Sequence, residues 1–528
     1  MGHTGNIAAR LDGSRGILRV RSSMHTRFLV FVLCAVQSGC LGERGPFTNR
    51  MANSGTSYLS RAARQPVHWQ PWGRDAFALA AKLDRPVLLY IGSDACRWCA
   101  ETDREIYTDR EIGALINALF VPIRVDRDER PDVAQRYQAA VERLAGLHGW
   151  PLTVFLTADG SPFFGGTYFP ADDPITGRGL KQLLPEVAKR YRDQRAFILQ
   201  QAAALQQLVL TGSGESRGAL RPSLVQQGMV AVTRELDDAV RTHAAAGSVM
   251  HVEATALVLS GDTTARASAV RALDLMLDTA VGTAGEDPPR LVRAALAGTL
   301  AKAWAVTGEP RYRESGGALI RSLVTALSPD EAVFVDQEAY VIEHVMVAAA
   351  TLGEPAVASR ARTALDALLQ RTYARGWGVR HATVAPAAGV TTPQGMLQDQ
   401  VQVASACLAA HQLSNERRYL DVVLDLVAIV ERGYADPLGG YYDVAPTDPS
   451  PSSQPALGDR TKHVFDDVLP GANAATALLL AHLARVTGDP SYRRRAQATL
   501  EAFAGAMSGA GVRASTFLAA TRATLEIP

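Results

Sequence analysis

A pair of cysteines that directly follows a short apolar run constrains the fold of this chain more than any other feature. Residues 85–92 (Arg-Pro-Val-Leu-Leu-Tyr-Ile-Gly) have the pattern of a buried strand bounded by proline and glycine. Cys96 and Cys99 come next, in Ser-Asp-Ala-Cys-Arg-Trp-Cys-Ala-Glu, where a helix is expected to begin. A strand that runs into C-x-x-C at a helix start is typical of thioredoxin-like domains.

The residues after this junction alternate between helical and extended patterns. A helix is expected over 108–118, strands over 120–126, 149–157 and 163–169, and a hairpin turn at 159–160. Strands that alternate with helices and end in a hairpin indicate an α/β thioredoxin-like domain, which we place at residues 41–179.

The two cysteines have different expected roles. Backbone N–H groups at a helix N-terminus stabilise a thiolate, so Cys96 is expected to be the attacking nucleophile. Cys99 lies one turn later, close enough to form a disulfide with Cys96 and release a mixed-disulfide partner. Arg97 favours the thiolate of Cys96 and Asp94 opposes it, so the direction of electron transfer depends on a potential that the sequence leaves open.

A proline before the last strand pair points to the same fold. Trp150-Pro151 is the expected cis peptide, the backbone element that faces the cysteine pair in thioredoxin folds. Half of a zinc site is an alternative use of C-x-x-C, but zinc needs four ligands and there is no second cysteine pair; His68 and His148 are the nearest histidines. We therefore expect no metal and no cofactor, and a purely structural cysteine pair stays open as an alternative.

The segment 49–172 resembles the thioredoxin-like domain of the spermatogenesis-associated protein 20 family. The matching strings are residues 65–73, 125–132, 149–157 and 163–170. That family carries Cys-His-Trp-Cys-His, whereas Arg97 and Ala100 stand here in place of its histidines, and Cys96, Trp98 and Cys99 are kept. The resemblance implies that thiol exchange survives, while metal binding or proton shuttling by those histidines does not carry over.

Packing is the plainer explanation for the other unusual strings in this segment. The aromatic residues Trp69, Trp72, Phe164 and Tyr168 suit core and loop packing. The charged run 126–132 suits capping and salt bridges before a helix that starts at Pro131. The alternative is a groove for a partner near the cysteines.

The second half of the chain is expected to be all helical. Residues 180–216 are expected to form a helical linker, and a recurring turn then marks helix pairs over 217–528. Turns of this design occur at 260–262, 307–310, 352–355, 414–416 and 487–490, each with Gly or Asn followed by an acid and often by Pro. Stacked helix pairs form either an open solenoid or a closed α/α toroid, and the Gly-aromatic loops at 376–378 and 439–443 favour the toroid.

The family also carries a six-hairpin-like helical domain, and residues 396–503 resemble its later part. Asp399, the loop 439–443 and residues 470–473 stand where the family pattern leads us to expect them. The Gly-rich, Lys-Phe-Pro and His-Phe-Glu-Lys stretches that open the family's helical domain are missing. The resemblance therefore implies that any pocket formed by those stretches is lost.

Glycoside hydrolysis in a toroid requires two carboxyl groups about 5 to 9.5 Å apart. The candidates are Asp336, Glu338, Asp399, Asp443 and Asp466, with His463 as a further polar group. Each of these residues is more often a helix cap or a surface group than a catalytic one.

The N-terminus resembles an export signal. The nine apolar residues 28–36 are too few to span a membrane but suit a secretory signal, with Met24 as an alternative start. Residues 1–40 are therefore expected to be a signal peptide, Cys40 a lipidation site, and the protein periplasmic or membrane-anchored. Of the other cysteines, Cys34 lies in the signal and Cys407 suits a buried helix face.

These features support three hypotheses. The first is an exported thiol–disulfide oxidoreductase that acts on protein thiols or disulfides, with a helical domain that binds a partner or ligand. The second is a carbohydrate-binding or carbohydrate-processing toroid with a structural thioredoxin-like domain, and the third is a non-enzymatic envelope binding protein. A formal net charge of +1 argues against a nucleic-acid partner.

Overall fold

The structure is a computed structural model that describes residues 47–173, 175–176, 179–211, 216–242, 248–261, 263–282, 288–327, 333–383, 395–446 and 460–526. Residues from Asn49 onward form one compact unit. The expected signal peptide, with Cys40, lies outside the described residues. Among the residues that are described, no helix combines the length and the apolar character needed to cross a membrane.

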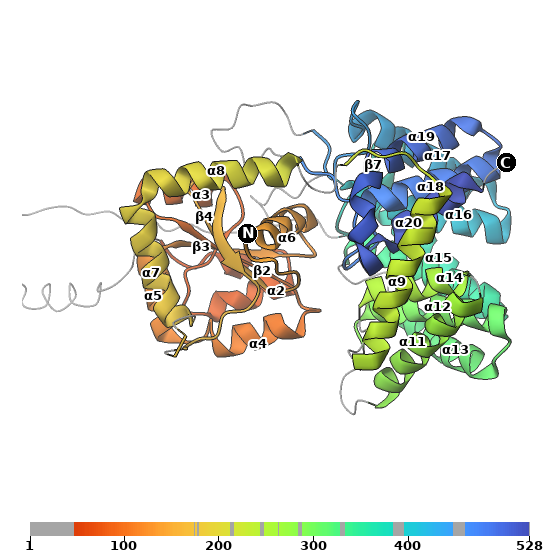
Figure 1. Cartoon of the computed structure of the whole chain (residues 1–528), viewed down its shortest axis with the longest axis horizontal. Helices are drawn as coiled ribbons and strands as arrows, with labels where there is room; N and C mark the ends of the chain where they lie inside the picture. Colours follow the sequence, from red (N-terminus) through yellow and green to blue (C-terminus); the bar gives the residue numbers. More distant parts are fainter. Residues whose placement is uncertain are drawn as a thin grey trace, which may run out of the picture. The chain divides into compact units, whose positions relative to one another are not determined.

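A mixed five-stranded sheet forms the centre of the N-terminal part (Figure 1). Its strands are β1 (Gln70–Pro71), β2 (Val87–Gly92), β3 (Val121–Asp126), β4 (Leu152–Leu156) and β5 (Pro162–Gly166). Their order in the sheet is β1-β3-β2-β4-β5. β1 and β2 are parallel to β3, whereas β4 is antiparallel to both β2 and β5. This topology confirms the predicted thioredoxin-like fold, and only the short edge strand β1 had no counterpart in the prediction.

Helices cover both faces of this sheet. They are η1 (Met51–Asn53), α2 (Ser57–Arg61), η2 (Ala62–Arg64), α3 (Arg74–Leu83), α4 (Arg97–Glu105), α5 (Arg110–Leu119), α6 (Pro131–Ala145), α7 (Leu180–Asp193) and α8 (Arg195–Thr211). Apolar side chains of α2, α5 and α7 share one buried cluster with Leu88 and Tyr90 of β2. Helices α6 and α8 contact β5 instead.

The helices α7 and α8 belong to the thioredoxin-like part of the chain. Residues 180–193 and 195–211 are helical, as expected, but they do not behave as a linker. Leu180, Leu184 and Val187 of α7 join the buried cluster, and α8 packs on β5 and α6. Burial of these apolar side chains is the physical reason for the difference, and the change to the second fold follows α8.

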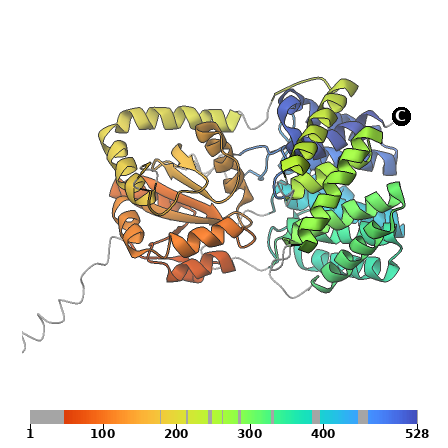
Figure 2. The ribbon, with the colours of Figure 1, turned by 60° about the horizontal axis from the view of Figure 1, so that its bottom comes forward.

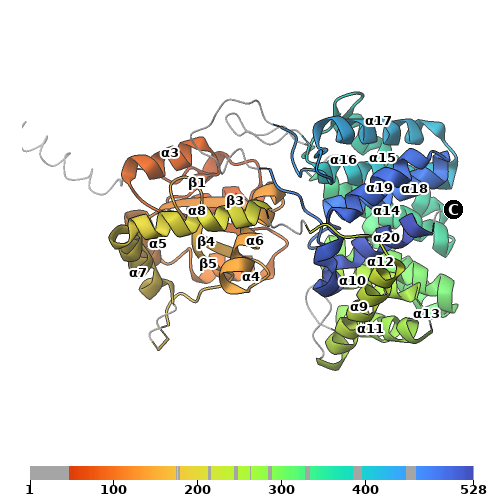
Figure 3. The ribbon, with the colours of Figure 1, turned by 45° about the horizontal axis from the view of Figure 1, so that its top comes forward.

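Twelve helices in the described part of the second half form a closed α/α ring. The inner helices are α10 (Val249–Leu259), α12 (Arg290–Thr307), α14 (Val335–Leu352), α16 (Leu397–Ser414), α18 (Ala472–Thr487) and α20 (Ser515–Leu525). The outer helices are α9 (Pro222–Thr242), α11 (Thr263–Gly282), α13 (Pro310–Thr325), α15 (Pro355–Thr372), α17 (Arg417–Gly433) and α19 (Pro490–Glu501). Each inner helix contacts the next, and α20 contacts α10, which closes the ring and excludes an open solenoid. Figures 2 and 3 show these helices from two further directions.

Short elements complete this part of the chain. They are the hairpin of β6 (Tyr373–Ala374) and β7 (Gly378–Val379), and the 3-10 helices η4 (Ala504–Gly509) and η5 (Gly511–Ala514).

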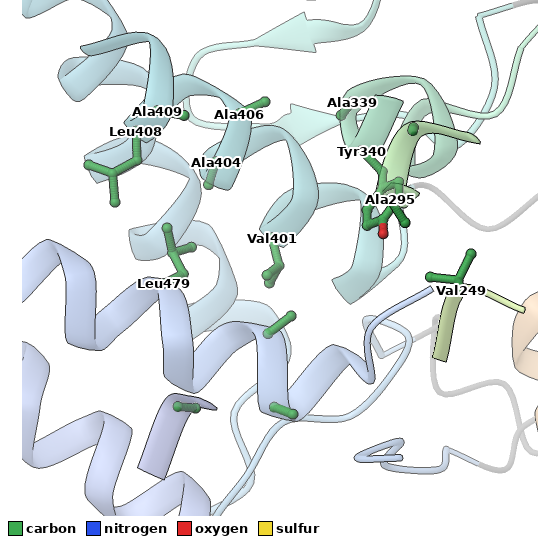
Figure 4. Packing of buried hydrophobic residues seen from close by; sticks show 14 of the residues in the cluster. Val249, Ala295, Ala339, Tyr340, Val401, Ala404, Ala406, Leu408, Ala409 and Leu479 are labelled. Carbon is green, nitrogen blue, oxygen red and sulfur yellow. The ribbon is translucent and has the colours of Figure 1, made fainter. Parts of the chain in front are cut away.

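The inner helices are apolar on nearly all sides because they are surrounded by other helices. Figure 4 shows buried side chains of α10, α12, α14, α16 and α18 that meet inside the ring, many of them alanines. Small side chains let these helices approach closely. Cys407 is buried in α16, as predicted, and burial raises the pKa of its thiol.

The recurring turn has the predicted left-handed cap at four of its five positions. At 260–262 the prediction is wrong, because the C-cap residue of α10 is Ser260 with φ of −86° and Gly261 has no positive φ. Gly308, Gly353, Asn415 and Gly488 end inner helices with φ of 72°, 76°, 58° and 73°, the left-handed conformation that favours glycine and asparagine. An acid precedes each following outer helix, and proline takes the first position of α13, α15 and α19. The hydroxyl of Tyr312 donates to Asp274, and that of Tyr419 donates to Asp366, in each case on the preceding outer helix. The same hydrogen bond between neighbouring outer helices thus occurs twice in the ring.

We expect Gly308→Ala to destabilise the ring by about 1 to 2 kcal/mol, because a Cβ is unfavourable in the left-handed conformation. An added Cβ meets no atom within 4 Å at this site, so the cost is conformational alone. Gly433→Ala is the matched control, since that glycine also has open space but ordinary helical backbone. Urea unfolding followed by circular dichroism measures both, and equal stability of Gly308→Ala and the unmodified chain would contradict this account.

Candidate functional site

The cysteine pair lies where the central strand meets a helix. β2 ends at Gly92, and Cys96 is the N-cap residue of α4. Cys96 Sγ accepts a hydrogen bond from the backbone N–H of Cys99 at 3.1 Å. The two cysteines form a disulfide, with Cα atoms 5.2 Å apart. This placement gives Cys96 the helix N-terminus that its predicted role requires.

The two sulfur-bearing residues differ in exposure. Cys96 is partly exposed, whereas Cys99 is 0% exposed. Arg97 is exposed and Trp98 is 61% exposed, with its ring centroid 6.4 Å from that of Tyr168. A partner molecule can therefore reach Cys96 beside an exposed aromatic pair, while Cys99 is shielded.

Gly92 gives the Cys99 sulfur its place. A Cβ at Gly92 would lie 2.9 Å from Cys99 Sγ and 2.2 Å from the Tyr58 hydroxyl oxygen. Both distances are shorter than real Cβ contacts, so no larger residue fits without displacing these groups. The sequence-based prediction used Gly92 only as the end of a strand and missed this contact.

Pro151 reaches the same end of the sheet. The Trp150-Pro151 bond is cis, as predicted. Ile91 of β2 pairs with Leu152 of β4, so the register continued by one residue places Pro151 beside Gly92. Gln138 of α6 fixes the preceding loop, because its side chain accepts from the N–H of Gly149 and donates to the carbonyl of Leu147.

Asp94 is already paired in this structure. Its carboxylate contacts Arg61 and the hydroxyl of Ser57, both on α2. This pairing offsets the negative charge that the sequence placed near Cys96.

A buried cation lies on the same face of the sheet as Cys99. Arg124 of β3 is fully buried and donates two hydrogen bonds to Asp103, at 2.7 and 2.6 Å. Its guanidinium lies 4.2 Å from the ring centroid of Tyr58 and 5.1 Å from that of Tyr90. Removal of one partner from such a pair typically costs about 3–5 kcal/mol, so we assign it a structural role.

Asp126 supplies a titratable group at the end of β3. It pairs in register with Gly92 and therefore faces the same side as Cys99. Burial raises the pKa of Asp126 to about 7, with the charge of Asp128 adding to the effect. This carboxyl can exchange a proton near neutral pH.

Three of the carboxylates proposed for carbohydrate chemistry have structural partners. Asp399 accepts from the N–H of Met396 at the start of α16. Asp466 accepts from the N–H groups of Gly471 and Thr516, at the starts of α18 and α20. Glu338 pairs with Arg290. For these three the capping or pairing alternative describes the structure.

Asp336, His381 and Asp399 form the one cluster in the described residues whose ligand atoms could surround a metal ion, all within 4.8 Å of one another. His381 Nδ1 contacts Asp399 at 2.9 Å, and Nε2 contacts the carbonyl of Asp128 at 2.8 Å. Asp399 and Asp336 raise the pKa of His381 to about 10 against the effect of burial. These contacts describe a buried His381–Asp399 ion pair that is tied to the backbone at Asp128.

The loop 439–443 is bound to the start of α18. The Asn473 side chain accepts from the N–H of Tyr441 at 2.7 Å and donates to its carbonyl at 2.9 Å. Asp443 accepts from the Thr461 hydroxyl and the N–H of His463. The predicted elements 439–443 and 470–473 are therefore brought together, but through structural hydrogen bonds.

Asp336 and Asp443 line a common pocket of about 60 Å³ together with Asp467. Burial raises the pKa of both Asp336 and Asp443 to about 7. The pocket has room for a few water molecules. These are the candidate acids that the structure brings together.

Several site residues had no usable sequence signal. Tyr58 and Arg124 come from separate segments and meet only through the fold, and the same holds for His381 and Asp399. A glycine that ends a strand just before C-x-x-C was the available sign for Gly92.

Solved structures similar to this chain include two carbohydrate-related proteins. An unsaturated glucuronyl hydrolase specific for heparin is 13% identical with a TM-score of 0.44, covering 58% of this chain and 98% of that one. A D-mannose isomerase is 12% identical with a TM-score of 0.40, covering 53% and 86%. At such identities the likeness concerns the fold alone.

The N-terminal part matches known sequences. Residues 48–210 match the sequence model of a family described as a protein of unknown function, DUF255. Spermatogenesis-associated protein 20 of Rattus norvegicus is 37% identical over 170 residues, and that of Homo sapiens is 36% identical over 170. Each match covers 32% of this chain and 22% of the relative, about a fifth of its length. The resemblance to spermatogenesis-associated protein 20 is therefore confirmed, and it lies in the part of the chain that matches the DUF255 family model.

Proposed function

We propose that the protein is a thiol–disulfide oxidoreductase of the cell envelope, in which Cys96 exchanges with a partner and Cys99 resolves the mixed disulfide. The observation that carries this proposal is the asymmetry of the pair. Cys96 is partly exposed at the N-terminus of α4, whereas Cys99 is buried against Gly92. A partner can thus approach one sulfur, and the other is in reach of Cys96 alone.

The reaction with a partner disulfide has two steps. The Cys96 thiolate attacks one partner sulfur, the partner's S–S bond breaks, and the second partner sulfur leaves as a thiolate that takes up a proton. The Cys99 thiol then loses its proton, and its sulfur attacks Cys96 Sγ. The mixed disulfide breaks, which releases the first partner sulfur as a thiolate. Two electrons pass to the partner, and the reverse sequence oxidises a dithiol, so the potential of the pair decides the direction.

Protein thiols or disulfides are the proposed partners. Trp98 and Tyr168 offer them an exposed aromatic contact beside Cys96. The proposal includes export through residues 1–40 and lipid attachment at Cys40, with the helical ring binding a partner or ligand.

We expect Cys99→Ser to trap partner proteins on Cys96, because the mixed disulfide then has no resolving thiol. Cys96→Ser is the matched variant and should trap far less, since Cys99 is shielded. Non-reducing electrophoresis after acid quenching measures the adducts, and the double variant Cys96→Ser/Cys99→Ser gives the background from the other cysteines. Equal trapping by both single variants would contradict the assigned roles, and trapping by neither would remove thiol exchange as the function.

We expect Gly92→Ala to lower stability by about 1–3 kcal/mol and to slow disulfide formation by Cys99, because the new Cβ displaces Cys99 and Tyr58. Tyr58→Phe removes the nearer of the two obstructing atoms. The double variant Gly92→Ala/Tyr58→Phe should therefore recover part of the lost stability. Urea unfolding and alkylation of the thiols report the two effects, and an unperturbed Gly92→Ala variant would show that the close approach is absent in solution.

A carbohydrate-related activity of the ring is the second candidate function. The observation in its favour is the shared pocket of Asp336 and Asp443, since a carboxyl with a pKa near 7 can act as a general acid. Its small size means that a sugar ring fits only if the lining residues move apart.

If this candidate is right, the protein releases reducing ends from envelope oligosaccharides, and Asp336→Asn and Asp443→Asn each lose this activity by about 100-fold or more. Asp466→Asn is the matched control, because burial raises its pKa to about 7 as well but its oxygens cap two helices outside the pocket. No release by the unmodified protein, or equal loss in the control, would reject a hydrolytic role.

A further inference from the structure

A larger cavity lies beside the small acidic pocket and plays no part in thiol exchange. It encloses about 360 Å³, within the range of small-molecule sites. One wall is formed by α6 and His148 of the loop that follows it. The other is formed by residues 461–467 and by Arg513 of η5. The thioredoxin-like part and the helical ring therefore each supply part of the lining.

Two buried nitrogen atoms in this lining have no hydrogen-bond partner in the described part of the chain. They are His463 Nε2 and Arg513 Nε. Arg513 is held in place, because its guanidinium lies 4.9 Å from the ring centroid of Phe465 and its Nη1 donates to Glu142 at 3.0 Å. Arg513 Nε is a donor, and an unmet buried donor costs about 1–3 kcal/mol, so it favours a molecule that brings an acceptor. Burial lowers the pKa of His463 to about 4, and its other ring nitrogen bonds the backbone of Phe465, so the neutral ring offers Nε2 as an acceptor for a hydroxyl.

The lining also carries more positive than negative charge. The cations are Arg136, Arg143, His148, Lys462 and Arg513, and the acids are Glu142, Asp443 and Asp467. Hydrogen bonds to Asp467 and Glu142 raise the pKa of His148 to about 9, so it is charged at neutral pH. Burial raises the pKa of Asp443 to about 7, which reduces its negative charge there. Lys462 is paired with Asp436, which does not line the cavity, and the remaining cations still outnumber the acids, which favours an anion.

The polar groups of the wall suit hydroxyls as well as a carboxylate. Gln135, Gln138 and Thr461 contribute amide and hydroxyl groups next to the cations. Such a mixture of charged and neutral polar groups is typical of sites that orient a small polar ligand.

We propose that this cavity binds a small organic anion of the size of a sugar acid, with Arg513 and His463 contacting its oxygen atoms. The proposal does not depend on thiol exchange, because no lining residue belongs to the cysteine site. It also requires no hydrolysis by Asp336 or Asp443. Since both parts of the chain line the cavity, the bound anion joins them.

Isothermal titration of the whole chain tests the proposal. Glucuronate is the probe, and glucose is its matched control because it lacks the carboxylate. We expect glucuronate to bind at least about tenfold more tightly than glucose, and added salt to weaken its binding. Equal binding of the two sugars, or no binding of glucuronate, would overturn the proposal.

Variants locate the site. We expect Arg513→Gln and His463→Gln each to weaken glucuronate binding by about tenfold or more. Arg522→Gln is the matched control, because Arg522 lies on α20, pairs with Glu526 and does not line the cavity. Circular dichroism checks that each variant folds. Unchanged affinity in both cavity variants, or equal loss in the control, would place the binding elsewhere and refute the assignment.

Discussion

The position of β2 in the middle of the sheet is the constraint on which the thiol site depends. This strand pairs with β3 on one side and β4 on the other, and all six of its residues are buried. Its end is therefore fixed by hydrogen bonds on both edges. Gly92 leaves room for the sulfur of Cys99. The residues that follow Gly92 connect β2 to Cys96 at the start of α4. The register with β4 places Pro151 beside Gly92. The thiol site needs all three of these features together.

The charged run 126–132 makes polar contacts both within the thioredoxin-like part and with the helical ring. Its residues form local ion pairs, as the sequence suggested, but the N-cap residue Arg130 makes no side-chain capping hydrogen bond to α6. The carbonyl of Asp128 also contacts His381 of the ring, and Glu142 of α6 contacts Arg513. The ring thus presents charged groups to the thioredoxin-like part, and the cavity of about 360 Å³ lies among them. A ligand bound in this cavity would contact residues of both parts.

Local sequence patterns were sufficient to predict most of the fold. The strands, the Pro131 helix start and the helix-ending turns follow from burial periodicity and backbone conformation, which depend on neighbouring residues. The glycines and the asparagine that end inner helices could be predicted from the sequence, because few other residues adopt a positive φ. The role of residues 180–211 could not be predicted, since an amphipathic helix has the same sequence pattern whether it links two domains or packs on one of them.

The sequence by itself determined the cysteine pair, the cis proline and the two kinds of fold, because each rests on residues close together in the chain. Only the tertiary structure decided that Gly92 supports Cys99, that Arg124 is buried beside Tyr58, and that His381 binds Asp399. It also decided which acids cap helices and which line a cavity. These outcomes depend on contacts between distant segments, and a side chain's burial, charge state and partners are set by those contacts rather than by its neighbours in sequence.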